Sequence, residues 1–159
     1  MTRIVIETRI QAPIELCFDL ARDVGAHAES AAFTSERVVE PGRTQGLLEI
    51  GDIVAFEGRH LGITQRFVAR ITALDRPARF VDEMVEGAFE RLRHVHEFEF
   101  NDGTTIMRDT LNWVAPFGVV GRFADLLFLR RPMCWFVTRK QSALKCIAEE
   151  RARSLTHNK

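Results

Sequence analysis

Two histidines and an aspartate are the side chains of this 159-residue sequence whose types and spacing best suit chemistry. His94 and His96 are separated by one residue, and Asp109 follows in the next stretch of alternating apolar and polar residues. Such alternation is typical of β-strands. Between the two stretches lies Asp102-Gly103, a pair that tolerates the positive φ angles of a tight hairpin turn. We therefore predict that the three side chains come from two adjacent antiparallel strands.

The turn also predicts the register of this hairpin. If its two residues form the loop, Asn101 pairs with Thr104, and counting back along both strands places His96 opposite Asp109. Alternate residues share one face of a sheet, and this face also carries a set of apolar side chains: Phe98, Phe100, Met107, Leu111 and Trp113. Polar groups on a covered apolar face are costly unless partnered. We expect the imidazoles and the carboxylate to pair with one another, with water or with a ligand.

The three polar residues are compatible with more than one role. His96 beside Asp109 has the pattern of a general base with its orienting carboxylate, and His94 would then polarise a carbonyl. The interpretation that we favour is a histidine–aspartate hydrogen bond that only satisfies two polar groups. A metal site made of the same three residues is possible by residue type, but His-x-His on a strand is a weak signal. We predict no metal and no cofactor.

The strand that precedes the hairpin leaves its register open. The connection through Ala88-Phe89-Glu90 holds either two or three residues. With two, Glu83 lies opposite His96, and with three, Met84 does, because a shift by one residue turns the other face of a strand inward.

The rest of the chain has the pattern of an α+β domain. Strands are predicted at 2–10, 36–40, 53–58, 63–74, 80–87, 92–100 and 104–114. Short helices are predicted after Pro13 and at 26–32, and a long helix, with Val120 and Phe123 among its apolar residues, runs to about Glu150. Pro132 should kink or split it. We predict a curved antiparallel sheet of about six to seven strands wrapped around this helix, in a single domain at 1–151 followed by a polar tail at 152–159 that frays.

Several short motifs in these elements resemble those of the START-like superfamily, also called SRPBCC. The resemblance is carried by Ile10-Gln11-Ala12-Pro13 ahead of Phe18, by the run Arg79–Met84, and by His94 and His96. The superfamily includes polyketide cyclase/dehydrase-like proteins, birch-pollen-allergen-like proteins and lipid-transfer START domains. The resemblance implies a helix-grip fold with a hydrophobic cavity between the sheet and the long helix. It implies no single activity.

Composition argues against several classes of partner. The 22 basic and 22 acidic residues cancel, so no overall charge attracts nucleic acid. The most apolar region, 117–137, is interrupted by charged residues, which argues against stable membrane insertion, and the alternating N-terminus does not resemble a signal peptide. Cys17, Cys134 and Cys146 lack CxxC spacing and predict buried thiols in a reducing cytoplasm. The oligomeric state stays open.

We predict that the domain binds a hydrophobic or amphipathic small molecule, such as a lipid or a polyketide. The predicted ligand-binding residues are Phe67, Met84, His94, His96, Phe98, Met107, Asp109, Leu111, Trp113 and Phe136. The cavity mouth is placed near four further residues, which are equally compatible with solvated surface: His27, Ser30, Arg59 and His60. The first alternative is a cyclase or dehydratase that uses His96 and Asp109 for acid–base catalysis. The second is a regulator that binds another protein through the exposed ends of the long helix, as Arg130-Arg131 next to Trp135 suggests.

Overall fold

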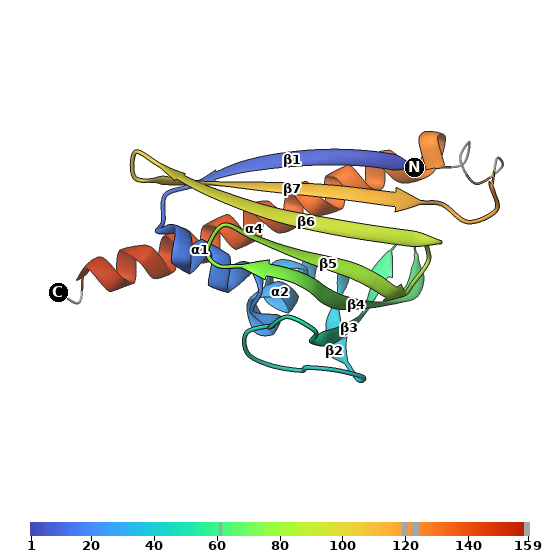
Figure 1. Cartoon of the computed structure of the whole chain (residues 1–159), viewed down its shortest axis with the longest axis horizontal. Coiled ribbons are helices and arrows are strands. Elements are labelled where there is room, and N and C mark those ends of the chain that lie inside the picture. The colour runs from blue at the N-terminus through green and yellow to red at the C-terminus, as the bar shows by residue number, and fades with distance from the viewer. Residues whose placement is uncertain (61, 119–120, 122–124, 158–159) are drawn as a thin grey trace.

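The computed structural model describes residues 1–60, 62–118, 121 and 125–157. Within these residues an antiparallel sheet of seven strands has the order β1-β7-β6-β5-β4-β3-β2 (Figure 1). The strands are β1 (Thr2–Ile10), β2 (Arg37–Val39), β3 (Ile53–His60), β4 (Ile63–Asp75), β5 (Arg79–Glu86), β6 (Arg91–Asn101) and β7 (Thr104–Val114). The first strand in the sequence, β1, therefore lies at one edge of the sheet and pairs with the last strand, β7. From β7 the strands follow in reverse sequence order to β2, which forms the other edge.

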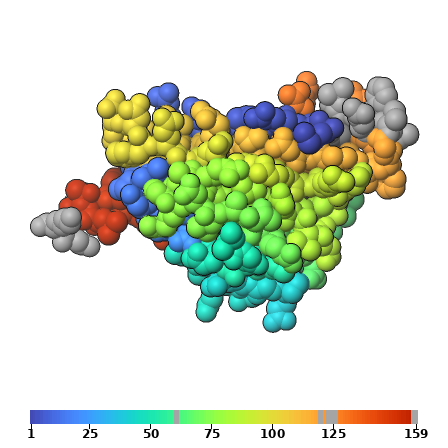
Figure 2. Space-filling view, viewed as in Figure 1, coloured from blue at the N-terminus to red at the C-terminus, as the bar shows by residue number. Residues whose placement is uncertain are grey.

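Helices cover one face of this sheet. Two short helices, α1 (Ile14–Ala21) and α2 (Val24–Ser30), follow β1, and the long helix α4 (Arg130–His157) runs along the same face (Figure 1). The α2 helix begins where Asp23 caps it by accepting a hydrogen bond of 2.8 Å from the backbone N–H of Ala26. The predicted α+β helix-grip architecture is confirmed. In Figure 2 the strands cover the near side of the molecule, and α4 projects beyond the sheet at one end.

The hairpin of β6 and β7 has the predicted register. Asn101 pairs with Thr104 and His96 with Asp109, and Asp102 has a positive φ of 47°. One prediction for this face needs correction, because Phe100 is 51% exposed rather than covered. It lies one pair from the tip of the hairpin, opposite Thr105.

The register of β5 differs from both predicted alternatives. Phe80 pairs with His96, and Asp82 pairs with His94. The ladder between β5 and β6 closes at Glu83 and Arg93, so the connection is wider than the two or three residues expected. The shift places Asp82 on the covered face, while Glu83 forms an ion pair of 3.1 Å with Arg93 outside.

The C-terminal helix also differs from its prediction. A π-helical turn at Asp125–Leu129 leads directly into α4, in which Pro132 is the third residue. The helix continues to His157, and residues 152–157 are helical although they were expected to fray. Val120 and Phe123, expected on the apolar face of this helix, lie outside the described residues.

The core consists of two packed groups. Phe18 of α1 is fully buried and meets the rings of Phe80 and Phe98 edge-on at 5.6 and 5.4 Å. Trp113 is the largest fully buried side chain and belongs to the second group, with Ile4, Leu92, Leu111 and Val137. The helices are thereby fixed to the sheet at its two ends, and the space between them is left for a cavity.

The three cysteines are free thiols. Cys17 is buried as expected, but Cys134 and Cys146 are exposed on α4, which corrects the expectation that all three are buried. In the part of the chain that the structure describes, no helix is long and apolar enough to cross a membrane.

Candidate functional site

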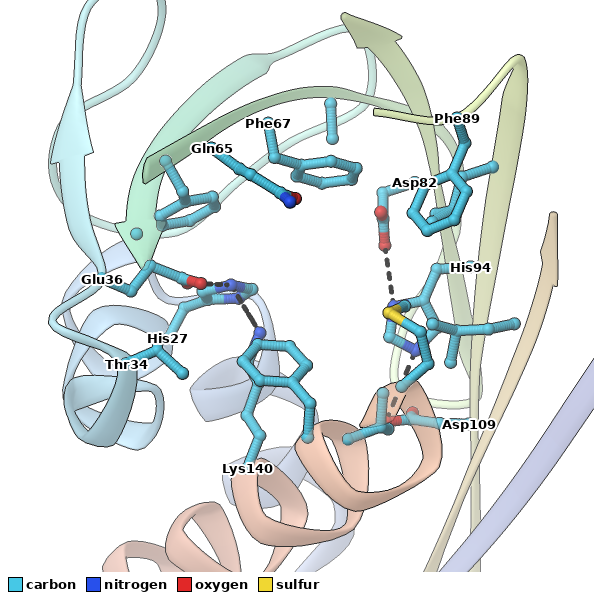
Figure 3. Close-up of a pocket in the computed structure, with 18 of the residues that line it drawn as sticks. His27, Thr34, Glu36, Gln65, Phe67, Asp82, Phe89, His94, Asp109 and Lys140 are labelled. Carbon is cyan, nitrogen blue, oxygen red and sulfur yellow. Dashed lines mark hydrogen bonds and ion pairs between the residues drawn. The ribbon is translucent and has the colours of Figure 1, made fainter. Parts of the chain in front are cut away.

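A cavity of about 570 Å³ lies between the sheet and α4 (Figure 3). Its walls are mostly apolar and include Leu48, Phe56, Ala69, Ile71, Leu111, Met133 and Leu144. The exposed side chains of Arg59, Arg66 and Phe117 also line it, so the cavity reaches solvent near these residues. Its volume falls within the range of about 300 to 1,000 Å³ that is common for small-molecule sites.

The structure brings most of the predicted ligand-binding residues to this cavity. Those that line it are Phe67, His94, His96, Met107, Asp109, Leu111 and Phe136. The other three pack in the core beside it. Phe98 is covered by the ring of Phe18, and Trp113 is fully buried in a group that Met84 also contacts.

Two imidazoles and two carboxylates form a compact group on one wall, which we call the histidine–aspartate cluster: Asp82, His94, His96 and Asp109. His96 Nε2 lies 3.0 Å from Asp82 Oδ2, and His96 Nδ1 lies 2.9 Å from Asp109 Oδ1. His94 Nδ1 lies 3.8 Å from Asp82 Oδ2, and His94 Nε2 lies 3.5 Å from Asp109 Oδ2. The two rings are 3.8 Å apart. Each imidazole therefore faces Asp82 with one nitrogen and Asp109 with the other.

The strands explain why these four groups meet. His94 and His96 are two residues apart on β6, so both point inward. Asp82 is the partner of His94 on β5, and Asp109 is the partner of His96 on β7. The stacked ring of Phe80, 4.1 Å from that of His96, packs against the cluster. Three adjacent strands thus hold it, which is a more rigid platform than a loop.

Charge and burial act in opposite directions on the cluster. Burial alone would lower the pKa of His96, but the carboxylates of Asp109 and Asp82 outweigh it and raise this pKa to about 9. Burial lowers the pKa of His94, and the adjacent charge of His96 lowers it further. Burial would raise the pKa of Asp82 and of Asp109, but contact with His96 holds both below the ordinary value. At neutral pH, His96 is therefore a hydrogen-bond donor, and His94 is the neutral imidazole.

A second polar group, the lysine cluster, consists of His27, Glu36 and Lys140. Lys140 Nζ lies 3.0 Å from His27 Nδ1, and His27 Nε2 lies 3.3 Å from Glu36 Oε1. The imidazole stacks on Phe56 with ring centroids 4.2 Å apart. Figure 3 shows this cluster across the cavity from Asp82, His94 and Asp109. The two ends of the cavity are polar, and the walls between them are apolar.

The rotation of α4 that directs Lys140 inward is fixed by its neighbour. Gln141 is 2% exposed and accepts a hydrogen bond of 2.6 Å from the hydroxyl of Thr8 on β1. Its amide donates to the carbonyl of Ile6 at 3.5 Å. Because a buried amide needs such partners, Gln141 holds the helix in one orientation against β1.

Acidification is expected to destabilise the fold through His27. Burial, together with the charge of Lys140, lowers its pKa to about 4, while Glu36 and the more distant Asp82 oppose this shift. An unfolded histidine has a pKa of about 6.5, so the unfolded chain binds more protons between these two values. The stabilisation is complete above the unfolded pKa and is lost as pH falls toward 4.

Urea unfolding of the wild type and His27→Gln at about pH 7 and about pH 4.5 measures this contribution. The free energy of unfolding of the wild type should fall by about 1–3 kcal/mol more than that of the variant. Equal losses in the two proteins would show that His27 does not carry the effect.

Sequence reasoning missed the three residues that complete the two polar clusters: Asp82, Glu36 and Lys140. Asp82 was missed because the register of β5 was open, and nothing in the sequence pointed to Glu36. Lys140 had a usable signal, because it stands four residues after Phe136 and four before Leu144, on the apolar face of the helix.

Of the four residues predicted near the cavity mouth, His27 and Arg59 line the cavity, and so does a third. Ser30 lines it too, is 1% exposed and donates to the carbonyl of His27 at 2.8 Å. The side chain of His60 lies outside the described part of the structure.

No protein-family model matches this sequence, and no curated protein matches it. Solved structures do match the fold. TTHA0849 from Thermus thermophilus is 20% identical with a TM-score of 0.73, over 91% of this chain and 94% of that chain. CV1439 from Chromobacterium violaceum is 12% identical with a TM-score of 0.71, over 92% and 96%. Major latex-like protein 151 from Panax ginseng is 10% identical with a TM-score of 0.69, over 92% and 97%. The chain therefore shares the helix-grip fold of these proteins over nearly its whole length.

Proposed function

We propose that this chain binds one hydrophobic or amphipathic small molecule, such as a lipid or a polyketide, in the cavity between the sheet and α4. The observation that supports this most directly is a cavity of about 570 Å³ with apolar walls and a polar cluster on each of two sides (Figure 3). Apolar surface that leaves water for such a site gains about 25 cal/mol per Å². The walls supply affinity, and the polar clusters supply orientation.

The two clusters favour different ligand groups. The ammonium of Lys140 and the imidazolium of His96 donate hydrogen bonds, so they suit carbonyl, hydroxyl or carboxylate oxygens. The carboxylates of Asp82 and Asp109 accept, so a hydroxyl group fits beside them. An apolar body with oxygen atoms at its ends, rather than a plain hydrocarbon, is the ligand chemistry that fits both sides.

Titration with the apolar fluorophore N-phenyl-1-naphthylamine tests this function. We expect saturable fluorescence enhancement at one site per chain, and displacement by hydroxylated or carboxylated lipids at lower concentration than by an alkane of equal length. Native mass spectrometry of protein purified without added ligand should show the same stoichiometry for any co-purified molecule. Fluorescence that rises without saturation, together with a purely apo mass spectrum, would contradict the proposal.

Acid–base catalysis of the cyclase or dehydratase type stays a prediction, and the structure changes the roles that it needs. His96 contacts two carboxylates, which favour its protonated form and suit an acid rather than the predicted base. His94 is the neutral imidazole and would be the base. Both residues line the cavity, so a bound carbonyl compound would meet both.

A further inference from the structure

The histidine–aspartate cluster is not satisfied by its own contacts. Among the described residues, His94 Nε2 and Asp109 Oδ1 are buried and lack a hydrogen bond. His96 Nδ1 lies 2.9 Å from Asp109 Oδ1, but the geometry makes this a contact between charges rather than an aligned hydrogen bond. Buried polar atoms in folded proteins are nearly always partnered. The cluster therefore has capacity for a further group.

Its charges point to a cation. Metal ions bind the neutral form of imidazole, so in a metal-bound cluster the charge to be balanced is that of the two carboxylates, about −2, in a largely apolar wall. Balancing both carboxylates through the imidazoles requires two imidazolium rings, whose centroids are 3.8 Å apart, and like charges at this separation repel strongly in a buried site. A single divalent cation balances the two carboxylates without that repulsion.

The donor atoms are spaced as metal ligands are. One atom each from Asp82, His94 and His96 lies within 4.8 Å of the others. Around a tetrahedral zinc ion with bonds of about 2.1 Å, ligand atoms are about 3.4 Å apart. The distances of Asp82 Oδ2 from His96 Nε2 and His94 Nδ1, 3.0 and 3.8 Å, bracket this value. Two imidazoles and one carboxylate form a donor set that suits zinc and other first-row transition metals rather than magnesium or calcium.

Asp109 occupies the position of an outer carboxylate. Metal-bound histidines commonly direct their second ring nitrogen at a carboxylate, which sets the tautomer and the ring orientation. Asp109 faces this second nitrogen of both rings, at 2.9 Å from His96 and 3.5 Å from His94. The side chain of Asp82 is 14% exposed, against 6% for Asp109, so the Asp82 side of the rings is the more accessible one.

We propose that Asp82, His94 and His96 bind a divalent transition-metal ion, with Asp109 as the positioning residue that orients both imidazoles. This departs from the sequence-based expectation of no metal, in which Asp82 was not placed beside the histidines. Three protein ligands leave at least one coordination position open, and because the ligands line the cavity, a bound oxygen atom or water completes the shell. The proposal stands on the cluster alone and does not depend on ligand binding elsewhere in the cavity.

Isothermal titration of chelator-treated protein with zinc chloride tests the site, and cobalt chloride provides a second readout through its visible d–d absorption. We expect one ion per chain and a cobalt spectrum of low coordination number. Loss of an outer carboxylate typically weakens metal binding by about 10- to 100-fold, which is the effect expected for Asp109→Asn. Asp82→Asn and His94→Gln remove ligands and should each weaken binding by more than about 100-fold.

Two matched controls separate this site from adventitious binding. Glu97→Gln changes a carboxylate on the opposite face of β6 and should leave the zinc affinity unchanged. A Cys134→Ser/Cys146→Ser variant removes the two exposed thiols and should also retain one tight zinc ion. Circular dichroism spectra confirm that each variant is folded.

Three results would overturn the proposal. The first is absence of stoichiometric zinc and cobalt binding by the folded wild type. The second is full retention of affinity in folded His94→Gln and Asp82→Asn. The third is loss of binding in the cysteine variant alone. If the ligand variants do not fold, the wild-type cobalt spectrum and the zinc-induced shifts of histidine ring resonances decide, because among the described residues only His94 and His96 are adjacent imidazoles in the cavity.

Discussion

Replacing Asp109 by alanine is expected to lower the free energy of unfolding by about 3–5 kcal/mol, the cost of breaking a buried ion pair by removing one partner. Asp109 is 4% exposed and faces both imidazoles of the cluster. The variant leaves His96 with Asp82 as its remaining carboxylate contact within the cluster, in a wall where water is scarce. Urea unfolding in the presence of a chelator measures the loss without any contribution from metal binding.

The adjacent residue provides the matched control. Arg108 points to the outer face of β7 and forms an ion pair of 3.0 Å with Glu7, in which both side chains are more than 40% exposed, at 45% and 41%. Exposed pairs of this kind contribute about 0–1 kcal/mol, so Arg108→Ala should cost little. Asp109→Asn keeps the shape and should cost less than alanine. If Asp109→Ala were no more destabilising than Arg108→Ala, the cluster would not be the buried charge network described above.

Filling the cavity is expected to have the largest effect on ligand binding. Ala69 lies on β4, is 2% exposed and lines the cavity between Phe67 and Ile71. In Ala69→Trp the indole takes up space that a ligand would use, and the existing hollow reduces the overpacking cost that a filled core would impose. We expect the affinity for N-phenyl-1-naphthylamine to fall by at least about 100-fold, or about 2.7 kcal/mol.

The same indole on the other face tests whether the effect arises in the cavity. Arg70, the next residue, is exposed on the outer side of β4, so Arg70→Trp adds an equal side chain without entering the cavity. It should bind the probe as the wild type does. Equal probe affinities for folded Ala69→Trp and Arg70→Trp would place the binding site elsewhere. Thermal unfolding of both variants shows whether Ala69→Trp remains folded.

The parts of the fold that follow from local chemistry could be predicted from the sequence. Asp102-Gly103 specifies a two-residue turn, and a turn of known length transmits its register along both strands. This is why the pairing of His96 with Asp109 could be derived. The order of strands and helices likewise predicted the helix-grip architecture, because only the long helix is large enough to cover the concave face of the sheet.

The parts of the fold and of the site that depend on a wide connection or on tertiary packing could not be predicted from the sequence. No turn signal between β5 and β6 specifies where their ladder closes, so Asp82 was not placed beside His94. Glu36 reaches the cavity only because the chain returns there after α2, which no local pattern encodes. Lys140 was overlooked because a charged residue on an apolar helix face is usually assumed to extend toward solvent.

Two members of the lysine cluster belong to a different layer of the molecule from the histidine–aspartate cluster. The histidine–aspartate cluster is built entirely on β5, β6 and β7, whereas Lys140 and His27 come from α4 and α2. A molecule that contacts both clusters therefore links the helices to the strands. A shorter molecule engages one cluster only and adds no link between the helices and the strands. The distance between the two layers thus selects ligands by length, and this distance is set by the fold rather than by any single side chain.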